Sequence, residues 1–208
     1  EQDVGASGAT LGEIKARADV IMYVGSNPAN AHPRHLSRYS TFIRGYFREK
    51  GIMERKLIVI DPRYTDTAKL ATDFVQVQQG KDFELLSAMR AVLKGAEIPE
   101  EVAGVKKEKI IELVNIMKNA QFGVLFFGMG LTQTIGKHRN IDSAVLLVKD
   151  LNSFSKWIIL PMRGHWNVCG ANVVFTWQTG YPYSINFALT SSLISGAGTV
   201  SYTHLTLP

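Results

Sequence analysis

Glycine, amide and charged residues follow each of five apolar stretches in this sequence. Glycine lets a backbone approach a ligand closely, and the N–H groups at the start of a helix bind phosphate. An aspartate in such a position can accept hydrogen bonds from a ribose hydroxyl or a guanine edge. The pattern predicts a site for a long, anionic ligand that carries a nucleotide. In chain order, the candidate residues are Gly25, Ser26, Asn27 and His32; Asp61, Arg63 and Thr65; Gly80, Lys81 and Asp82; Gly128, Met129, Gly130 and Gln133; and Arg163, Gly164 and Asn167.

Four of the stretches before these residues are short and continuously apolar, which is typical of strands that are covered on both faces, while the third alternates Phe74, Val75 and Val77 with glutamine. Helical patterns separate them, so the alternation predicts an α/β fold with a Rossmann-like, doubly wound, mostly parallel sheet. In such a sheet, ligands bind beyond the carboxyl ends of the strands. The predicted strands are Asp19–Gly25, Arg55–Asp61, Asp73–Gly80 nearer the sheet edge, Phe122–Gly128 and Lys156–Pro161. The predicted helices are Thr10–Ala18, Arg34–Gly51, Thr65–Ala71, Lys81–Gly95, Lys106–Ala120 and His138–Asn152.

Two of these helices carry further signals. Thr10 and Glu13 have the spacing of a capping box at the start of the first helix. Between Arg34 and Gly51, apolar residues recur every three or four positions, so we expect this helix to turn its Tyr39–Phe47 stripe toward the core.

The composition of the chain narrows the class of protein. The sequence has 208 residues, 46% hydrophobic and 20% charged, with a formal net charge of +5. This is a globular composition, and the positive charge suits an anionic ligand as well as an ordinary basic surface. No run of lysine and arginine predicts nucleic-acid binding. The single cysteine, Cys169, excludes a disulfide framework and a cysteine cluster within these residues.

Targeting signals are also missing from the sequence pattern. No apolar run approaches the roughly 20 residues that a membrane-spanning helix needs. The first ten residues lack the basic and apolar regions of a signal peptide. These features lead us to expect a cytoplasmic protein with no membrane span.

Five blocks of the sequence, taken in order and spacing, resemble the molybdopterin oxidoreductases: "VGSNPANAHPRH", "IDPRYTDTAKLA", "QGKDFELLSAM", "GMGLTQ" and "PMRGHWNVCG". Within that superfamily, "AHPRHLSRYS", "GKHRNID", "LPMRGHWNV" and "WQTGYPYSINF" are similar to the family of formylmethanofuran dehydrogenase B subunits. The resemblance extends over residues 2–187. Each block alone is a weak signal, and the ordered set is a specific one.

The resemblance implies a catalytic subunit that reversibly reduces CO2 to formate in methanogenesis or other one-carbon metabolism. The cofactor would be a tungsten or molybdenum ion held by two pterin guanine dinucleotides, with an iron–sulfur cluster in a part upstream of this sequence. The implied partners are the other formylmethanofuran dehydrogenase subunits, including an amidohydrolase-like one and ferredoxin-like ones, together with CO2 or formate.

The resemblance also assigns roles to individual residues. Arg163 matches the family's active-site arginine beside the metal, where a guanidinium could bind formate through two hydrogen bonds and stabilise negative charge on bent CO2. Gly164 would leave room for it, and Asn167 could donate to a pterin. The loops Gly25–Asn27, Asp61–Arg63, Gly80–Asp82 and Gly128–Gln133 match positions that hold a guanine dinucleotide arm.

Some features of the family are missing from this sequence. Its metal-ligating cysteine or selenocysteine, followed by histidine, would precede Glu1, and Cys169 lies on the wrong side of Arg163 to replace it. We therefore expect no metal ligand in this chain, which would be an incomplete and inactive fragment. The expected organisation is a dinucleotide-binding α/β domain over 1–160, a crossover into a second, incomplete cofactor-binding domain over 161–188, and a tail of doubtful origin over 189–208. Residues 200–208 resemble a translated sequencing adapter.

Two other interpretations remain open at this point. The first is a formate dehydrogenase or another molybdopterin oxidoreductase. The second is a non-catalytic α/β module that binds a nucleotide. Taken singly, Gly-Ser-Asn-Pro is usually a turn and Asp-Pro-Arg after a strand is usually a helix cap, so the functional interpretation depends on all five strand ends together.

Overall fold

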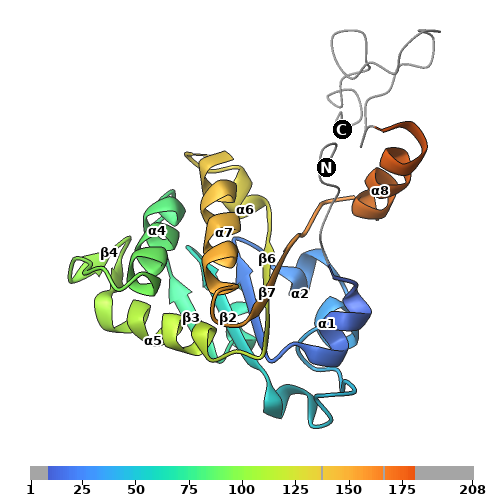
Figure 1. Cartoon of the computed structure of the whole chain (residues 1–208), viewed down its shortest axis with the longest axis horizontal. Helices are drawn as coiled ribbons and strands as arrows, with labels where there is room; N and C mark the ends of the chain where they lie inside the picture. Colours follow the sequence, from blue (N-terminus) through green and yellow to red (C-terminus); the bar gives the residue numbers. More distant parts are fainter. Residues whose placement is uncertain (1–8, 137, 166, 181–208) are drawn as a thin grey trace, which may run out of the picture. The chain divides into compact units, whose positions relative to one another are not determined.

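A five-stranded parallel sheet with helices on both faces forms the centre of the larger compact unit (Figure 1). The computed structural model describes residues 9–136, 138–165 and 167–180. The described chain forms two compact units, which divide between Met162 and Arg163. The strands of the sheet are β1 (Val20–Val24), β2 (Lys56–Asp61), β3 (Asp73–Gln76), β6 (Phe122–Phe127) and β7 (Lys156–Pro161). The predicted α/β, mostly parallel fold is confirmed.

The strand order is β3-β2-β1-β6-β7, and all four neighbouring pairs are parallel. Starting from β1, the chain adds β2 and β3 on one side and then returns to add β6 and β7 on the other. At the end of β1, Val24 therefore pairs with both Ile60 and Phe127. This reversal is the topological switch point at which open α/β sheets bind their ligands.

The two faces of β1 belong to two separate apolar clusters. Val20, Met22 and Val24 pack into the cluster that includes residues of helices α4, α5 and α7. Ile21 and Tyr23 pack into the other, which includes residues of α1 and α3. All five residues of β1 are buried, which explains why the strand is a continuous apolar run instead of an alternating one.

Four predicted helices are confirmed, with ends that differ by a few residues. They are α1 (Leu11–Arg17), α4 (Asp82–Leu93), α5 (Lys107–Lys118) and α7 (His138–Leu151). Thr10 caps α1 as predicted, because its side-chain oxygen accepts a hydrogen bond from the Glu13 N–H at 3.1 Å. None of the described helices combines the length and apolar character needed to cross a membrane.

Several short elements were not predicted, and one predicted helix is shorter than expected. The predicted Thr65–Ala71 helix is a single 3-10 turn, η2 (Ala68–Leu70). The elements missing from the sequence-based prediction are α2 (Pro28–Ala31), η1 (Gly51–Glu54), the hairpin of β4 (Glu101–Val102) and β5 (Val105–Lys106), α6 (Met129–Thr132), and α8 (Val168–Thr179) in the second unit. The predicted tail, residues 189–208, lies outside the described residues.

The predicted helix from Arg34 to Gly51 is wrong. Only α3 (His35–Arg38) is helical, and the chain then continues as an irregular stretch up to η1. Contacts with distant parts of the chain override the local period of three to four. The Phe47 N–H donates to the Ala16 carbonyl at 3.0 Å, and a Cβ at Gly45 would collide with the Lys15 carbonyl oxygen.

Arg55 holds the same stretch in place from the other side. Its side chain is buried, and its guanidinium donates to the Ser40 carbonyl and, at 2.6 Å, to the Lys15 carbonyl. The prediction that the aromatic residues of this stretch face the core is also wrong, because Tyr46 is 81% exposed and Phe47 is 54% exposed. The Tyr39–Phe47 stripe is therefore not part of the core. We refer below to residues 39–54 as the Tyr39–Glu54 segment.

Candidate cofactor site at the carboxyl edge of the sheet

Glycines join the loops after β1 and β6 at the switch point. The Gly130 N–H donates to the Gly25 carbonyl at 2.9 Å, and the Gly128 N–H donates to the Val24 carbonyl at 3.0 Å. Gly25 has a left-handed φ of 55°, and a Cβ there would lie 2.6 Å from the Leu131 nitrogen. The glycines were predicted to admit a ligand. In the structure they first allow two loops to approach each other without side chains between them.

A buried threonine joins the loops after β1 and β2. The Thr67 hydroxyl donates to Asn27 Oδ1 at 2.7 Å, and the Thr67 N–H donates to the same oxygen at 3.3 Å. The Thr67 oxygen also accepts from the Ala29 N–H at 3.1 Å. The predicted site residue Asn27 therefore uses its amide oxygen inside the protein. Sequence analysis did not identify Thr67, because its significance comes from burial and from partners about 40 positions earlier in the chain.

The loop after β1 also contacts the end of β7. The Ser26 hydroxyl is buried and donates to the Met162 sulfur at 3.3 Å. Together with the contacts to the β2 and β6 loops, this contact brings the carboxyl ends of four strands to one region, as the parallel topology predicts.

Two buried carboxyl groups lie at the ends of neighbouring elements of this edge. Asp61 ends β2 and accepts a hydrogen bond from the Arg63 N–H at 2.9 Å, while Asp82 is the first residue of α4. Only 3% of Asp61 and 5% of Asp82 is exposed. Burial raises the pKa of the Asp82 carboxyl, opposed by its backbone N–H, and the charges of Asp61 and Glu84 raise it further.

The nearby Thr134 hydroxyl acts in the opposite direction and lowers the Asp82 pKa. Thr134 follows α6, so the start of α4 lies near the β6–α7 loop. A pair of buried carboxyls in this arrangement favours a ligand that brings N–H donors or positive charge.

The two basic residues predicted at this edge face solvent. Arg63 Nε lies 3.7 Å from Asp61 Oδ1, and the Arg63 side chain is 78% exposed. Lys81 Nζ lies 3.0 Å from the Glu84 carboxylate, and its side chain is about half exposed. The Lys81–Glu84 pair is exposed on both sides and contributes little to stability, so Lys81 can turn toward an anionic ligand at small cost. Arg63 has an exposed guanidinium beside a buried partner, Asp61, at the longer distance of 3.7 Å.

The other predicted residues of the larger unit also lie at this edge, with various local roles. The Thr65 hydroxyl accepts from the N–H of Ala68, the first residue of η2, at 3.2 Å. Gly80 has a left-handed φ of 80° in the turn before α4, which favours glycine. Met129 and Gln133 are exposed around α6. His32 is half-buried, with its ring centroid 6.4 Å from that of His35.

Arg163, Gly164 and Asn167 belong to the second compact unit, so their part in the site stays a prediction. Arg163 and Gly164 are exposed, and a Cβ at Gly164 would meet no described atom within 4 Å. Asn167 has a left-handed φ of 50° just before α8. Cys169, in α8, is exposed and has a free thiol.

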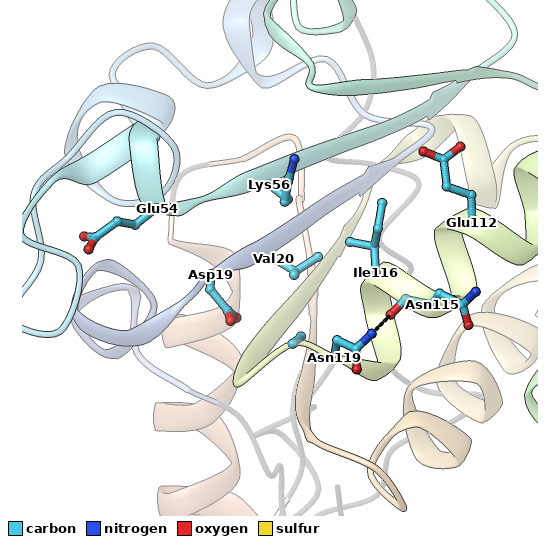
Figure 2. Close-up of a pocket in the computed structure, with 9 residues that line it drawn as sticks. Asp19, Val20, Glu54, Lys56, Glu112, Asn115, Ile116 and Asn119 are labelled. Carbon is cyan, nitrogen blue, oxygen red and sulfur yellow. Dashed lines mark hydrogen bonds between the residues drawn. The ribbon is translucent and has the colours of Figure 1, made fainter.

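A depression of about 480 Å³ lies at the opposite end of the sheet (Figure 2). Asp19, Lys56 and Ala120, which line it, stand at or before the amino ends of β1, β2 and β6. The Asp19 carboxylate already accepts from the Gln121 and Phe122 N–H groups at 2.8 and 2.9 Å. The depression is therefore distinct from the predicted cofactor site. Among the described residues, no cluster of three or more His, Cys, Asp or Glu side chains is suited to a metal ion.

The strand order and the parallel pairing define a Rossmann-like, doubly wound class of α/β fold. A solved structure with a similar fold is the formyltransferase/hydrolase complex FhcABCD from Methylorubrum extorquens, with a TM-score of 0.63 and 20% identity over 86% of this chain and 46% of that chain. This likeness supports the fold alone.

Sequence similarity gives a more specific relationship. The chain is 61% identical over 188 residues to the B subunit of the tungsten-containing formylmethanofuran dehydrogenase 2 of Methanocaldococcus jannaschii, which covers 90% of this chain and 43% of that relative. The predicted resemblance is therefore confirmed, and the chain is a homologue of the formylmethanofuran dehydrogenase B subunits. It spans less than half the length of the relative. No protein-family model matches the chain.

The formate dehydrogenases are more distant relatives. The alpha subunit of the F420-dependent formate dehydrogenase 1 of Methanococcus maripaludis is 32% identical over 183 residues, which cover 74% of this chain and 26% of that protein. The gap between 61% and 32% identity favours the formylmethanofuran dehydrogenase relationship over the alternative of a formate dehydrogenase.

Proposed function

We propose that this chain is part of the catalytic subunit of a formylmethanofuran dehydrogenase, which reversibly reduces CO2 to formate in one-carbon metabolism. The observation that carries the proposal is the 61% identity to a B subunit of such an enzyme over 90% of the chain. The proposed partners are the other subunits of the enzyme, including an amidohydrolase-like subunit that uses the formate and ferredoxin-like subunits that deliver electrons.

The residues at the carboxyl edge of the sheet fit a pterin guanine dinucleotide. The buried pair of Asp61 and Asp82 offers acceptors for the N–H donors of a guanine edge, and its mutual repulsion would fall when such donors bind. The exposed side chains of Arg63 and Lys81 can neutralise phosphates. When bound, the cofactor would supply two-electron redox chemistry at its tungsten or molybdenum ion.

The contacts between loops fix the backbone of this site. Asn27 and Thr67 fix the loop after β1, and the Gly25–Gly130 contact fixes the loop after β6. These loops present their backbone at the switch point, where a phosphate chain can approach glycine closely. We propose that residues 1–160 bind one dinucleotide and that residues 161–188 lead into a second cofactor-binding domain.

Arg163 is the residue that we propose acts on the substrate. A guanidinium can bind both oxygens of formate in one plane and stabilise the negative charge that develops as CO2 bends. A lysine carries the same charge but lacks the planar pair of donors. Gly164 and Asn167 would follow it into the second domain, with Asn167 as a donor to a pterin.

The test is an Arg163→Lys substitution in the complete parent enzyme. We expect the content of tungsten or molybdenum and of pterin to stay close to that of the wild type. Turnover of CO2 or formate should fall by about two powers of ten or more, because several kcal/mol of charge stabilisation would be lost. Arg38→Lys, at an exposed position on α3, is the matched control. Unchanged turnover in the Arg163 variant would remove this residue from the mechanism.

A further inference from the structure

The Tyr39–Glu54 segment exposes more large apolar side chains than a solvated loop requires. Tyr46 is 81% exposed, and Met53 is 83% exposed. Tyr46 and Phe47 stack edge to face with ring centroids 4.8 Å apart. Concentrated apolar exposure of this kind marks surfaces that bind another molecule. The large apolar residues that the segment exposes are Tyr39, Phe42, Tyr46, Phe47, Ile52 and Met53.

The backbone of the segment is fixed even though its side chains are exposed. Gly45 and Arg48 form an isolated bridge, in which the Gly45 N–H donates to the Arg48 carbonyl at 3.0 Å. Arg48 Nε donates to the Arg17 carbonyl at 3.1 Å, and the Glu54 carboxylate accepts from the Lys50 N–H at 2.9 Å. A surface held this way loses little conformational entropy when a partner binds, which favours recognition.

Positive charge surrounds the exposed rings. Arg17 places its guanidinium carbon 5.0 Å from the centroid of the Phe47 ring, and Lys15, Arg44 and Lys50 are also exposed. Aromatic residues with arginine are the composition that protein–protein interfaces favour. The charge predicts a partner with acidic side chains at the matching positions.

The part of the segment that carries Tyr46 and Phe47 lies away from the proposed cofactor site. Around Gly45–Arg48 its contacts are with the last turn of α1 and with Asp19 and Gln121, at the amino ends of β1 and β6, whereas Ser40 near its start hydrogen-bonds Tyr23 of β1 at 2.9 Å. Figure 1 shows the segment at the end of the sheet opposite to α6. A protein bound here would leave the carboxyl edge of the sheet open to its ligand.

We propose that the exposed aromatic and basic side chains of the Tyr39–Glu54 segment form the docking surface for another subunit of the enzyme complex. That subunit presents acidic side chains around an apolar pocket. The inference rests on the proposed function, because a catalytic subunit of this kind works beside other subunits. The part of a B subunit that this sequence does not match, which is more than half the length of the Methanocaldococcus jannaschii relative, is the alternative occupant that the experiment distinguishes.

The experiment uses the complete enzyme purified through a tag on its catalytic subunit, the parent of this chain. The Tyr46→Ser/Phe47→Ser double variant removes the two stacked rings and keeps the backbone contacts. Phe154→Ser is the matched control, since this aromatic is 50% exposed at a site remote in sequence and packs against Lys118. Arg44→Glu is a second variant that reverses an exposed charge and replaces no apolar group.

We expect the double variant to retain about tenfold less of one partner subunit, the loss expected for an interface anchor. Arg44→Glu should weaken retention of the same subunit, and Phe154→Ser should have no effect. The melting temperature of the separated catalytic subunit and its guanine-nucleotide content should match those of the wild type.

Two results would overturn the docking surface. Full retention of every subunit in both variants would do so. A lower melting temperature of the catalytic subunit with all partners retained would show instead that its own chain covers the segment. A wild-type preparation that holds no partner subunit and no guanine nucleotide would contradict the proposed function itself.

Discussion

The carboxyl edge of the sheet and the Tyr39–Glu54 segment are both irregular, yet they expose opposite kinds of side chain. At the carboxyl edge, the loops are held together by contacts such as that of Gly130 with Gly25, and the exposed groups are the basic side chains of Arg63 and Lys81. In the segment, Arg55 holds the backbone through its hydrogen bonds, and the exposed groups are aromatic rings. The fixed backbone is common to both regions, so the difference in exposed groups supports the two proposals: an anionic small molecule for one region and a protein for the other.

The two regions also differ in what they bury: the carboxyl edge buries carboxyl groups, and the segment does not. The carboxyl edge keeps the Asp61 and Asp82 carboxyls buried, with a donor to Asp61 from the Arg63 N–H, so their charge is held close to the loops that would meet a ligand. The segment instead satisfies its polar backbone groups internally and leaves apolar area uncovered, which costs little until a partner removes that area from water.

The largest effect should come from breaking the contact between loops at the switch point. In Gly25→Ala, the new Cβ would lie 2.6 Å from the Leu131 nitrogen, at a left-handed φ of 55°. We expect the free energy of unfolding to fall by about 3 kcal/mol, with a melting temperature roughly 10 °C lower. Urea unfolding followed by circular dichroism measures this change.

The matched control for that prediction is Gly12→Ala, in α1. A Cβ at Gly12 would meet only the Thr10 hydroxyl at 3.6 Å, an ordinary contact. We expect Gly12→Ala to be neutral or slightly stabilising, because alanine favours a helix over glycine. Equal destabilisation by the two substitutions would contradict the close packing of the loops.

A smaller effect is expected from releasing the Tyr39–Glu54 segment. Arg55→Met leaves the Ser40 and Lys15 carbonyls without their donor but also removes a buried charge, so we expect a loss of about 2 kcal/mol. Amide hydrogen exchange at Gly45 and Phe47 should accelerate while exchange in β1 stays slow. Arg38→Met, at an exposed position, should change neither quantity, and slow exchange in the Arg55 variant would show that other contacts fix the segment.

The smallest effect concerns the Asp82 carboxyl and depends on pH. Because its pKa is raised in the folded chain, the folded state binds a proton that the unfolded state has lost, and stability falls as pH rises above the ordinary value of 3.8. Asp82→Asn should therefore be slightly more stable than the wild type at neutral pH and equal to it below pH 3.8. Urea unfolding at both pH values, with the exposed Asp66→Asn as control, measures the difference, and a variant less stable at neutral pH would refute the assignment.

The strands and their mostly parallel arrangement could be predicted because the signal of each strand is local. β1 and β6 are continuous apolar runs, and the glycine and polar residues after them mark the edge where a parallel sheet binds ligands. The prediction of the Arg34–Gly51 helix was wrong because the contacts of Gly45 and Arg55 with α1 come from distant parts of the chain. The spacing of apolar residues along the sequence gives no information about such long-range contacts.

The candidate site was predictable to the level of loops. Parallel topology brings the residues after β1, β2, β6 and β7 to one edge, and the structure confirms their proximity through contacts such as Ser26 with Met162. That Asn27 would use its amide oxygen on Thr67 could not be predicted, because the pairing depends on the three-dimensional approach of two loops. The part of Arg163 in the site stays a prediction.

The most direct test of the account is the amount of GMP that acid releases from the catalytic subunit of the complete enzyme. Wild type should be compared with the Asp61→Asn/Asp82→Asn double variant, with Asp66→Asn as control. The account predicts that wild type and control release the same amount of GMP. The double variant should stay folded and lose most of the GMP of one dinucleotide. A double variant with undiminished GMP, or a wild type that releases none, would contradict the assignment of this edge as a guanine dinucleotide site.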